Sequence, residues 1–62
     1  MLVRYLDSAT KKVLGEEEIN GVLTAGEIVN LDRKYVVDKV LPFTIDGDTN
    51  VLYRPVYLKA PR

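Results

Sequence analysis

The sequence predicts an all-β protein, a small antiparallel barrel or curled sheet of about five strands. Two observations carry this prediction. Runs rich in Val, Ile, Leu and Tyr recur along the chain, and short polar or glycine-containing segments separate them. A chain of 62 residues is long enough for one domain, residues 1–62, around one small core.

The first part of the chain predicts two strands joined by a turn. Residues 2–6 form the first strand. Residues 7–12 are a polar turn, in which short oxygen-bearing side chains bond nearby backbone amides. A second strand is expected from about Val13 to Ile19, and the dipeptide Asn20-Gly21 marks the turn after it.

A helix over residues 8–19, capped by Asp7, is the alternative for this segment. Gly15 would lie inside that helix, where it costs about 1 kcal/mol relative to Ala. The segment also lacks a regular apolar stripe. A strand is therefore favoured, and little helix is expected in the protein.

The second part of the chain predicts three more strands. A third strand covers residues 26–31, and the polar break at residues 32–34 turns it into a fourth strand over residues 35–45. Residues 46–50 contain Asp-Gly, which predicts a hairpin turn with a residue at positive φ. The last strand runs over residues 51–58.

The strands carry more apolar side chains than one small interior would absorb. The fourth strand has apolar residues on both faces, and Pro55 in the last strand indicates an edge or a bulge because it cannot donate to a ladder. The chain has no Cys and no His, which excludes disulfides and nearly every zinc site. A small fold without disulfides or a structural metal often gains stability by oligomerisation. We therefore expect a homodimer with four leading interface candidates: Val36, Val40, Leu52 and Val56.

Composition narrows the function classes. Nine basic and nine acidic residues give a formal net charge of zero, so no strong field attracts nucleic acid or an anionic membrane. The apolar runs are too short for a membrane span, and the N-terminus lacks the pattern of a signal peptide. The expected location is the cytoplasm.

Three features that resemble chemical sites have simpler interpretations. Residues 46–50 place oxygen ligands like the start of a calcium loop, but Val51 and Tyr57 stand where that loop needs Gly and Glu. Residues 16–18 are three glutamates, which fit a solvated strand edge. Ser8 and the threonines have no visible activating base. We expect no metal, no cofactor and no enzymatic activity.

Tyrosine and arginine are the residue types most typical of binding here. The leading candidates for partner binding are Arg33, Tyr53, Arg54 and Tyr57. Tyr and Arg are enriched at hot spots of protein interfaces, and that function needs no net positive charge. The same residues could stack the bases of a single-stranded nucleic acid or a nucleotide. A protein partner is favoured, and nucleic acid is the alternative.

Two segments carry a resemblance to known proteins. Residues 25–37 resemble the Gly-acid-aliphatic hairpin of SH3-like small barrels. Residues 3–8 with residues 13–17 look like the first hairpin of short accessory proteins encoded by bacteriophages. This resemblance implies a phage-type inhibitor or adaptor that occupies a host protein, in some cases one of a defence system. It implies the cytoplasm of a bacterial host as the location.

Overall fold

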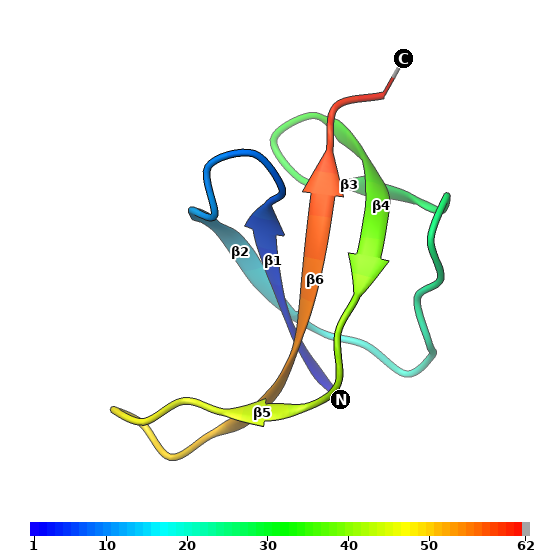
Figure 1. Cartoon of the computed structure of the whole chain (residues 1–62). Helices are drawn as coiled ribbons and strands as arrows, with labels where there is room; N and C mark the ends of the chain where they lie inside the picture. Colours follow the sequence, from blue (N-terminus) through cyan, green and yellow to red (C-terminus); the bar gives the residue numbers. More distant parts are fainter. Residues whose placement is uncertain (62) are drawn as a thin grey trace.

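The computed structural model describes residues 1–61 and shows an all-β protein without a helix among them (Figure 1). Five strands form one strongly curled sheet in the order β2-β1-β6-β4-β3, and β5 pairs with the beginning of β6. The two end strands of that order do not pair, so the barrel is half closed. The predicted fold class is confirmed. The strands are β1 (Leu2–Asp7), β2 (Val13–Glu18), β3 (Ile28–Asn30), β4 (Lys34–Val40), β5 (Thr44–Ile45) and β6 (Leu52–Lys59).

One strand pair departs from the antiparallel sheet that the sequence predicts. The first and last strands, β1 and β6, lie side by side and run parallel, with Tyr5 opposite Val56. The other pairs are antiparallel. A parallel pair needs a long connection between its strands, and here nearly the whole chain supplies it.

Two of the expected strands have different boundaries in the structure. The expected fourth strand, residues 35–45, is divided into β4 and β5 by residues 41–43. Pro42 explains the break, because proline lacks the N–H that would continue a ladder. The third strand is shorter than residues 26–31. The second strand and its preceding turn lie where expected, so the helix over residues 8–19 is excluded.

A bulge in β4 decides which of its side chains face inward. The register with β6 shifts between Val37 and Lys39, which leaves Asp38 as the extra residue. Val37 and Val40, three residues apart, consequently both lie on the inner face, opposite Leu58 and Val56. The sequence placed an edge or a bulge at Pro55 instead.

That expectation for Pro55 is wrong, since β6 lies in the middle of the sheet and its register does not shift there. The carbonyl of Pro55 accepts a hydrogen bond from the amide of Leu41 at 3.0 Å. This bond lies just beyond the end of β4 at Val40. The missing N–H of Pro55 therefore falls where the ladder between β4 and β6 is already ending.

Two turns of the protein are built on the same plan. In each, an aspartate (Asp7 or Asp46) accepts hydrogen bonds at Oδ1 from the amides two and three residues further on, at 2.8 and 3.1 Å or at 2.8 and 3.3 Å. Its carbonyl accepts at 2.8 Å from the amide four residues on. That fourth residue has a left-handed backbone: Lys11 with φ 66° and Asn50 with φ 58°. The positive φ expected in the second turn thus falls at Asn50, not in its Asp-Gly pair.

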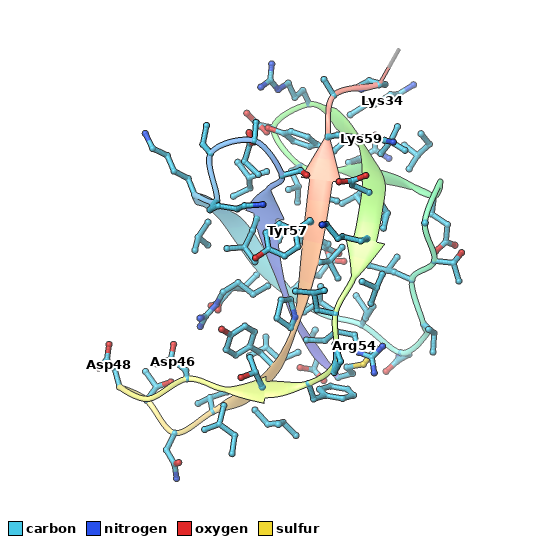
Figure 2. The ribbon with its side chains drawn as sticks, in the orientation of Figure 1. Lys34, Asp46, Asp48, Arg54, Tyr57 and Lys59 are labelled. Atoms are coloured by element: carbon cyan, nitrogen blue, oxygen red, sulfur yellow. The ribbon has the colours of Figure 1, made fainter. Side chains whose placement is uncertain are left out.

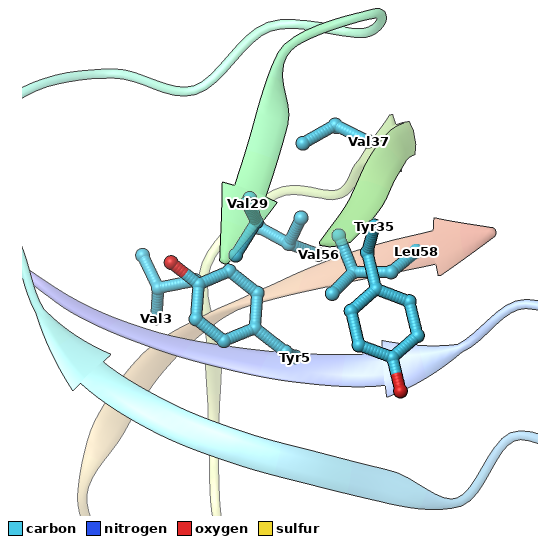
Figure 3. Packing of buried hydrophobic residues seen from close by; sticks show 7 residues of the cluster. All are labelled: Val3, Tyr5, Val29, Tyr35, Val37, Val56 and Leu58. Atoms are coloured by element: carbon cyan, nitrogen blue, oxygen red, sulfur yellow. The ribbon is translucent and has the colours of Figure 1, made fainter. Parts of the chain in front are cut away.

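The core lies on the inner side of the curl (Figure 3). Tyr5 and Tyr35 contribute the largest side chains, and their hydroxyl groups point away from each other. The Tyr35 hydroxyl donates to Asp32 Oδ1 and accepts from Arg33 Nε, both at 3.2 Å. Every described member of the buried cluster is hydrophobic: Val3, Tyr5, Val29, Tyr35, Val37, Val56 and Leu58.

Candidate binding surfaces

A two-stranded arm projects from the curled sheet (Figure 1). It consists of residues 43–53, which include β5, the turn after it and the start of β6. Among the strands, β5 contacts only β6. A two-stranded hairpin is marginally stable in water unless another surface packs against it. The arm is therefore the leading candidate for a contact with another molecule.

One face of the arm is apolar and exposed. Ile45 and Leu52 are cross-strand partners, so their side chains share a face. Phe43 lies two residues before Ile45, on the same side of the chain. Their exposed fractions are 59%, 55% and 43%, which are high for large apolar side chains.

Arg54 adjoins this apolar face. It follows Leu52 on the same side of β6, and its guanidinium carbon lies 4.3 Å from the centre of the Phe43 ring. Its Nε is buried without a hydrogen-bond partner, and within residues 1–61 it forms no ion pair. We call Phe43, Ile45, Leu52 and Arg54 the arm face. It combines apolar surface with one cation that has no carboxylate partner in the described chain.

The opposite side of the arm is braced by Arg4 of β1. The Arg4 guanidinium lies 3.0 Å from Asp46 Oδ2 and 2.5 Å from Glu16 Oε2, and it stacks on the Tyr53 ring at 4.0 Å. The pKa of Asp46 is lowered by the amide of Asp48 and then by Arg4. The arm is thus held to the sheet from one side and bare on the other.

A second surface surrounds Tyr57 on the convex side of the sheet (Figure 2). The amine of Lys11 lies 4.6 Å from the Tyr57 ring centre and that of Lys39 lies 5.8 Å from it. Asp38, in the bulge beside them, accepts a hydrogen bond from Ser8 Oγ at 2.7 Å. That bond, followed by the charges of Lys59 and Lys39, lowers the pKa of Asp38. The arrangement presents an aromatic ring with two cations and one nearby carboxylate.

The four residues predicted to bind a partner do not form one site. Tyr53 and Tyr57 lie on the convex side of β6, whereas Arg54 lies on the other side next to Phe43. Arg33 is in the turn before β4, where its Nε donates to the hydroxyl of Tyr35. The alternation of side chains along β6 was the sequence signal that separates Arg54 from the tyrosines.

The four residues predicted for a dimer interface also separate. Val56 is completely buried in the core, so the folded chain does not offer it to a second copy. Val40 packs against the core, and Val36 is partly buried between Ile28 and Lys59 on neighbouring strands. Leu52 alone of the four lies on the arm face.

Phe43 and Ile45 are the arm residues that sequence reasoning missed. Both lie inside the single fourth strand, residues 35–45, that the sequence predicts. The signal that could have identified them is Pro42, which ends the ladder and leaves only a short strand beyond it.

The described residues contain neither a cluster of metal ligands nor a membrane-spanning helix. Within residues 1–61, no three Asp or Glu side chains gather where they could hold a metal ion. Asp46, the first ligand of the calcium-like sequence, is engaged by backbone amides and by Arg4. The same residues contain no helix long and apolar enough to cross a membrane.

Comparison with known proteins adds no family. No family model matches the chain, and no curated protein or solved structure matches it significantly.

Proposed function

We propose that this chain is a non-enzymatic binding module that occupies the surface of a partner protein through its arm face. The observation that carries the proposal is the apolar face of Phe43, Ile45 and Leu52 on an arm whose short strand β5 contacts only β6 among the strands. A contiguous exposed apolar patch on a small protein is typical of an interaction site.

The chemistry of the arm face defines the partner. The surface of the partner is expected to offer an apolar patch that covers Ile45 and Leu52, and a carboxylate beside that patch that pairs with Arg54. Aromatic and arginine side chains commonly anchor such interfaces. The resemblance of the first hairpin to phage accessory proteins supports a bacterial host protein as that partner.

The test uses immobilised protein and a bacterial lysate, followed by direct binding measurements with the purified partner. Leu52→Asp places a charge in the middle of the arm face, and Arg54→Ala removes its cation. Each should weaken the complex about tenfold or more, which is about 1.4 kcal/mol. The loss should depend only moderately on salt concentration, since the chain has no net charge.

Val13→Asp is the matched control, because Val13 is 58% exposed but lies at the start of β2, outside the arm. It should bind like the unmodified chain. A partner that binds Leu52→Asp, Arg54→Ala and Val13→Asp equally well would refute the assignment of the arm face.

A second copy of the chain is the other protein that could cover the arm. The homodimer stays a prediction, now centred on Leu52 instead of Val56. Light scattering of a concentrated solution should show a dimer, and Leu52→Asp should convert it to a monomer. A monomer at every concentration of the unmodified chain would reject the homodimer and leave the partner-protein proposal in place.

A second candidate function is binding of single-stranded nucleic acid on the convex surface. The lysine amines of Lys11 and Lys39 beside Tyr57 favour it, because such proteins combine cations with aromatic stacking platforms. Fluorescence anisotropy with labelled oligonucleotides should then show affinity that falls steeply with salt. Tyr57→Ala should weaken binding by about 1–3 kcal/mol for a stacked base. No binding at micromolar protein and low salt would eliminate this function.

A further inference from the structure

A pocket lies where the half-closed barrel leaves a gap. Its volume is about 360 Å³, which is within the range of sites for small molecules. Glu17 of β2, the segment from Ile19 to Leu23 and the strand β3 form its walls, and Tyr5 closes it from the core side. The pocket is separate from the arm face, because none of its lining residues belongs to the arm.

The pocket walls are mostly aliphatic. Ile19, Val22, Leu23 and Val29 line it, and Val22 is 71% exposed. These side chains would gain from contact with a ligand's hydrocarbon part, at roughly 25 cal/mol for each Å² removed from water. The ligand class is therefore at least partly apolar.

Glu17 gives the pocket a negative charge. In the pairing of β1 with β2, Glu17 lies opposite Val3, whereas its neighbours Glu16 and Glu18 lie opposite Arg4 and Leu2. Glu17 thus points to the inner side of the sheet, and its two neighbours point to the outer side.

The three glutamates also differ in their partners. Glu16 pairs with Arg4, and Glu18 pairs with the terminal amine of Met1. Glu17 forms no ion pair within residues 1–61. Glu17 is therefore the carboxylate of β2 that has no cation in the described chain, and it lies beside the apolar walls of the pocket.

The hydroxyl of Tyr5 is a further polar group of the pocket, whose lining also includes Asn30. It donates a hydrogen bond to Glu17 Oε1 at 3.3 Å. Burial, followed by the charge of Glu17, raises the pKa of Tyr5 to about 12, so the hydroxyl keeps its proton at neutral pH. Its oxygen can still accept a hydrogen bond from a ligand.

We propose that this pocket binds a small aliphatic ammonium ion, with the hydrocarbon chain against Ile19, Leu23 and Val29 and the ammonium group at Glu17 and Tyr5. An ammonium group has three donors and no acceptor, which suits a carboxylate and a hydroxyl oxygen together. The ion supplies the cation that Glu17 lacks.

The experiment is an NMR titration of the unmodified chain with n-hexylammonium chloride at low salt. The signals of Tyr5, Leu23 and Val29 should shift and saturate at roughly millimolar concentration, as is reasonable for so small a ligand. The neutral analogue n-hexanol has the same hydrocarbon chain. It should bind about fivefold more weakly, as expected for the loss of one partly solvated ion pair.

Two variants locate the charge. Glu17→Gln should reduce the affinity for n-hexylammonium about fivefold and bring it to the level of n-hexanol. Glu18→Gln removes a charge from the outer side of the same strand and should bind n-hexylammonium like the unmodified chain.

Three results would overturn the proposal. The first is that n-hexanol and n-hexylammonium bind with equal affinity. The second is that Glu17→Gln and Glu18→Gln lose the same affinity for n-hexylammonium. The third is that the signals of the pocket residues do not shift at tens of millimolar ligand. The comparison of the two ligands uses the unmodified chain, so the test holds even where a variant does not fold.

Discussion

Replacing Arg54 by Met should leave the free energy of unfolding unchanged or raise it, although Arg54 lies on the central strand β6. The buried Nε of Arg54 has no hydrogen-bond partner, and an unsatisfied buried donor destabilises a fold by about 1–3 kcal/mol. The contact of the guanidinium with Phe43 offsets about 0.5–1 kcal/mol of that. Met has a similar unbranched stem and retains a sulfur–aromatic contact. The expected net change is a gain between zero and about 2 kcal/mol.

Urea unfolding followed by circular dichroism measures this change. A small protein has a slope of about 1 kcal/mol per molar urea, so a gain of about 1 kcal/mol moves the midpoint by about 1 M. Arg33→Met is the control, because Arg33 also stacks on an aromatic ring but its Nε is bonded to the Tyr35 hydroxyl. The control should lower the midpoint.

A loss of more than about 1 kcal/mol on Arg54→Met would show that the guanidinium supports the fold, and the reasoning from its unpaired Nε would fail. The same variant should weaken the partner complex. A substitution that raises the free energy of unfolding but weakens partner binding is expected where the original residue serves function at a cost in stability.

Three further predictions concern the fold. Exchanging the residues at the left-handed positions of the two similar turns should have opposite effects. Lys11→Asn should raise the free energy of unfolding by about 0.5–1 kcal/mol and Asn50→Lys should lower it similarly, since Asn tolerates positive φ better than Lys; thermal melts would show both. Leu58→Ala should destabilise the protein by about 2–5 kcal/mol, a large part of the total for so small a domain, and circular dichroism at low urea would then report substantial unfolding. The pKa of Tyr5 in the folded protein is about 12, above the ordinary value of 10.0. The contribution of Tyr5 to the free energy of unfolding is therefore complete below pH 10.0 and declines as the pH rises toward 12. Tyr5→Phe should remove that part of the alkaline loss, measured by urea unfolding across this pH range, and an unchanged pH profile would contradict it.

Much of the local structure was predictable from neighbouring residues. The turns at residues 7–12 and 46–50 follow from an aspartate whose carboxylate bonds the amides just after it. These features depend on interactions within a few residues, so the local sequence contains the information for them.

The composition of the candidate sites was only partly predictable. Arg54 and Leu52 were identified as contact residues, but the sequence could not group them with Phe43 and Ile45. Their shared face exists because β5 pairs with β6 beyond the end of β4. The pocket at Glu17 was not anticipated, because its walls come from β2 and β3, which lie at opposite ends of the sheet order.

The sequence by itself determined that this chain is a β-protein, where most of its strands lie and which residues form its turns, because hydrophobic alternation and turn chemistry act over short stretches. Only the tertiary structure decided that β1 and β6 run parallel, that Asp38 forms the bulge and that Val56 is buried. Those outcomes depend on the register between strands that are distant in sequence. A shift by one residue exchanges the covered and exposed sides of a strand, and short-range patterns do not fix that register.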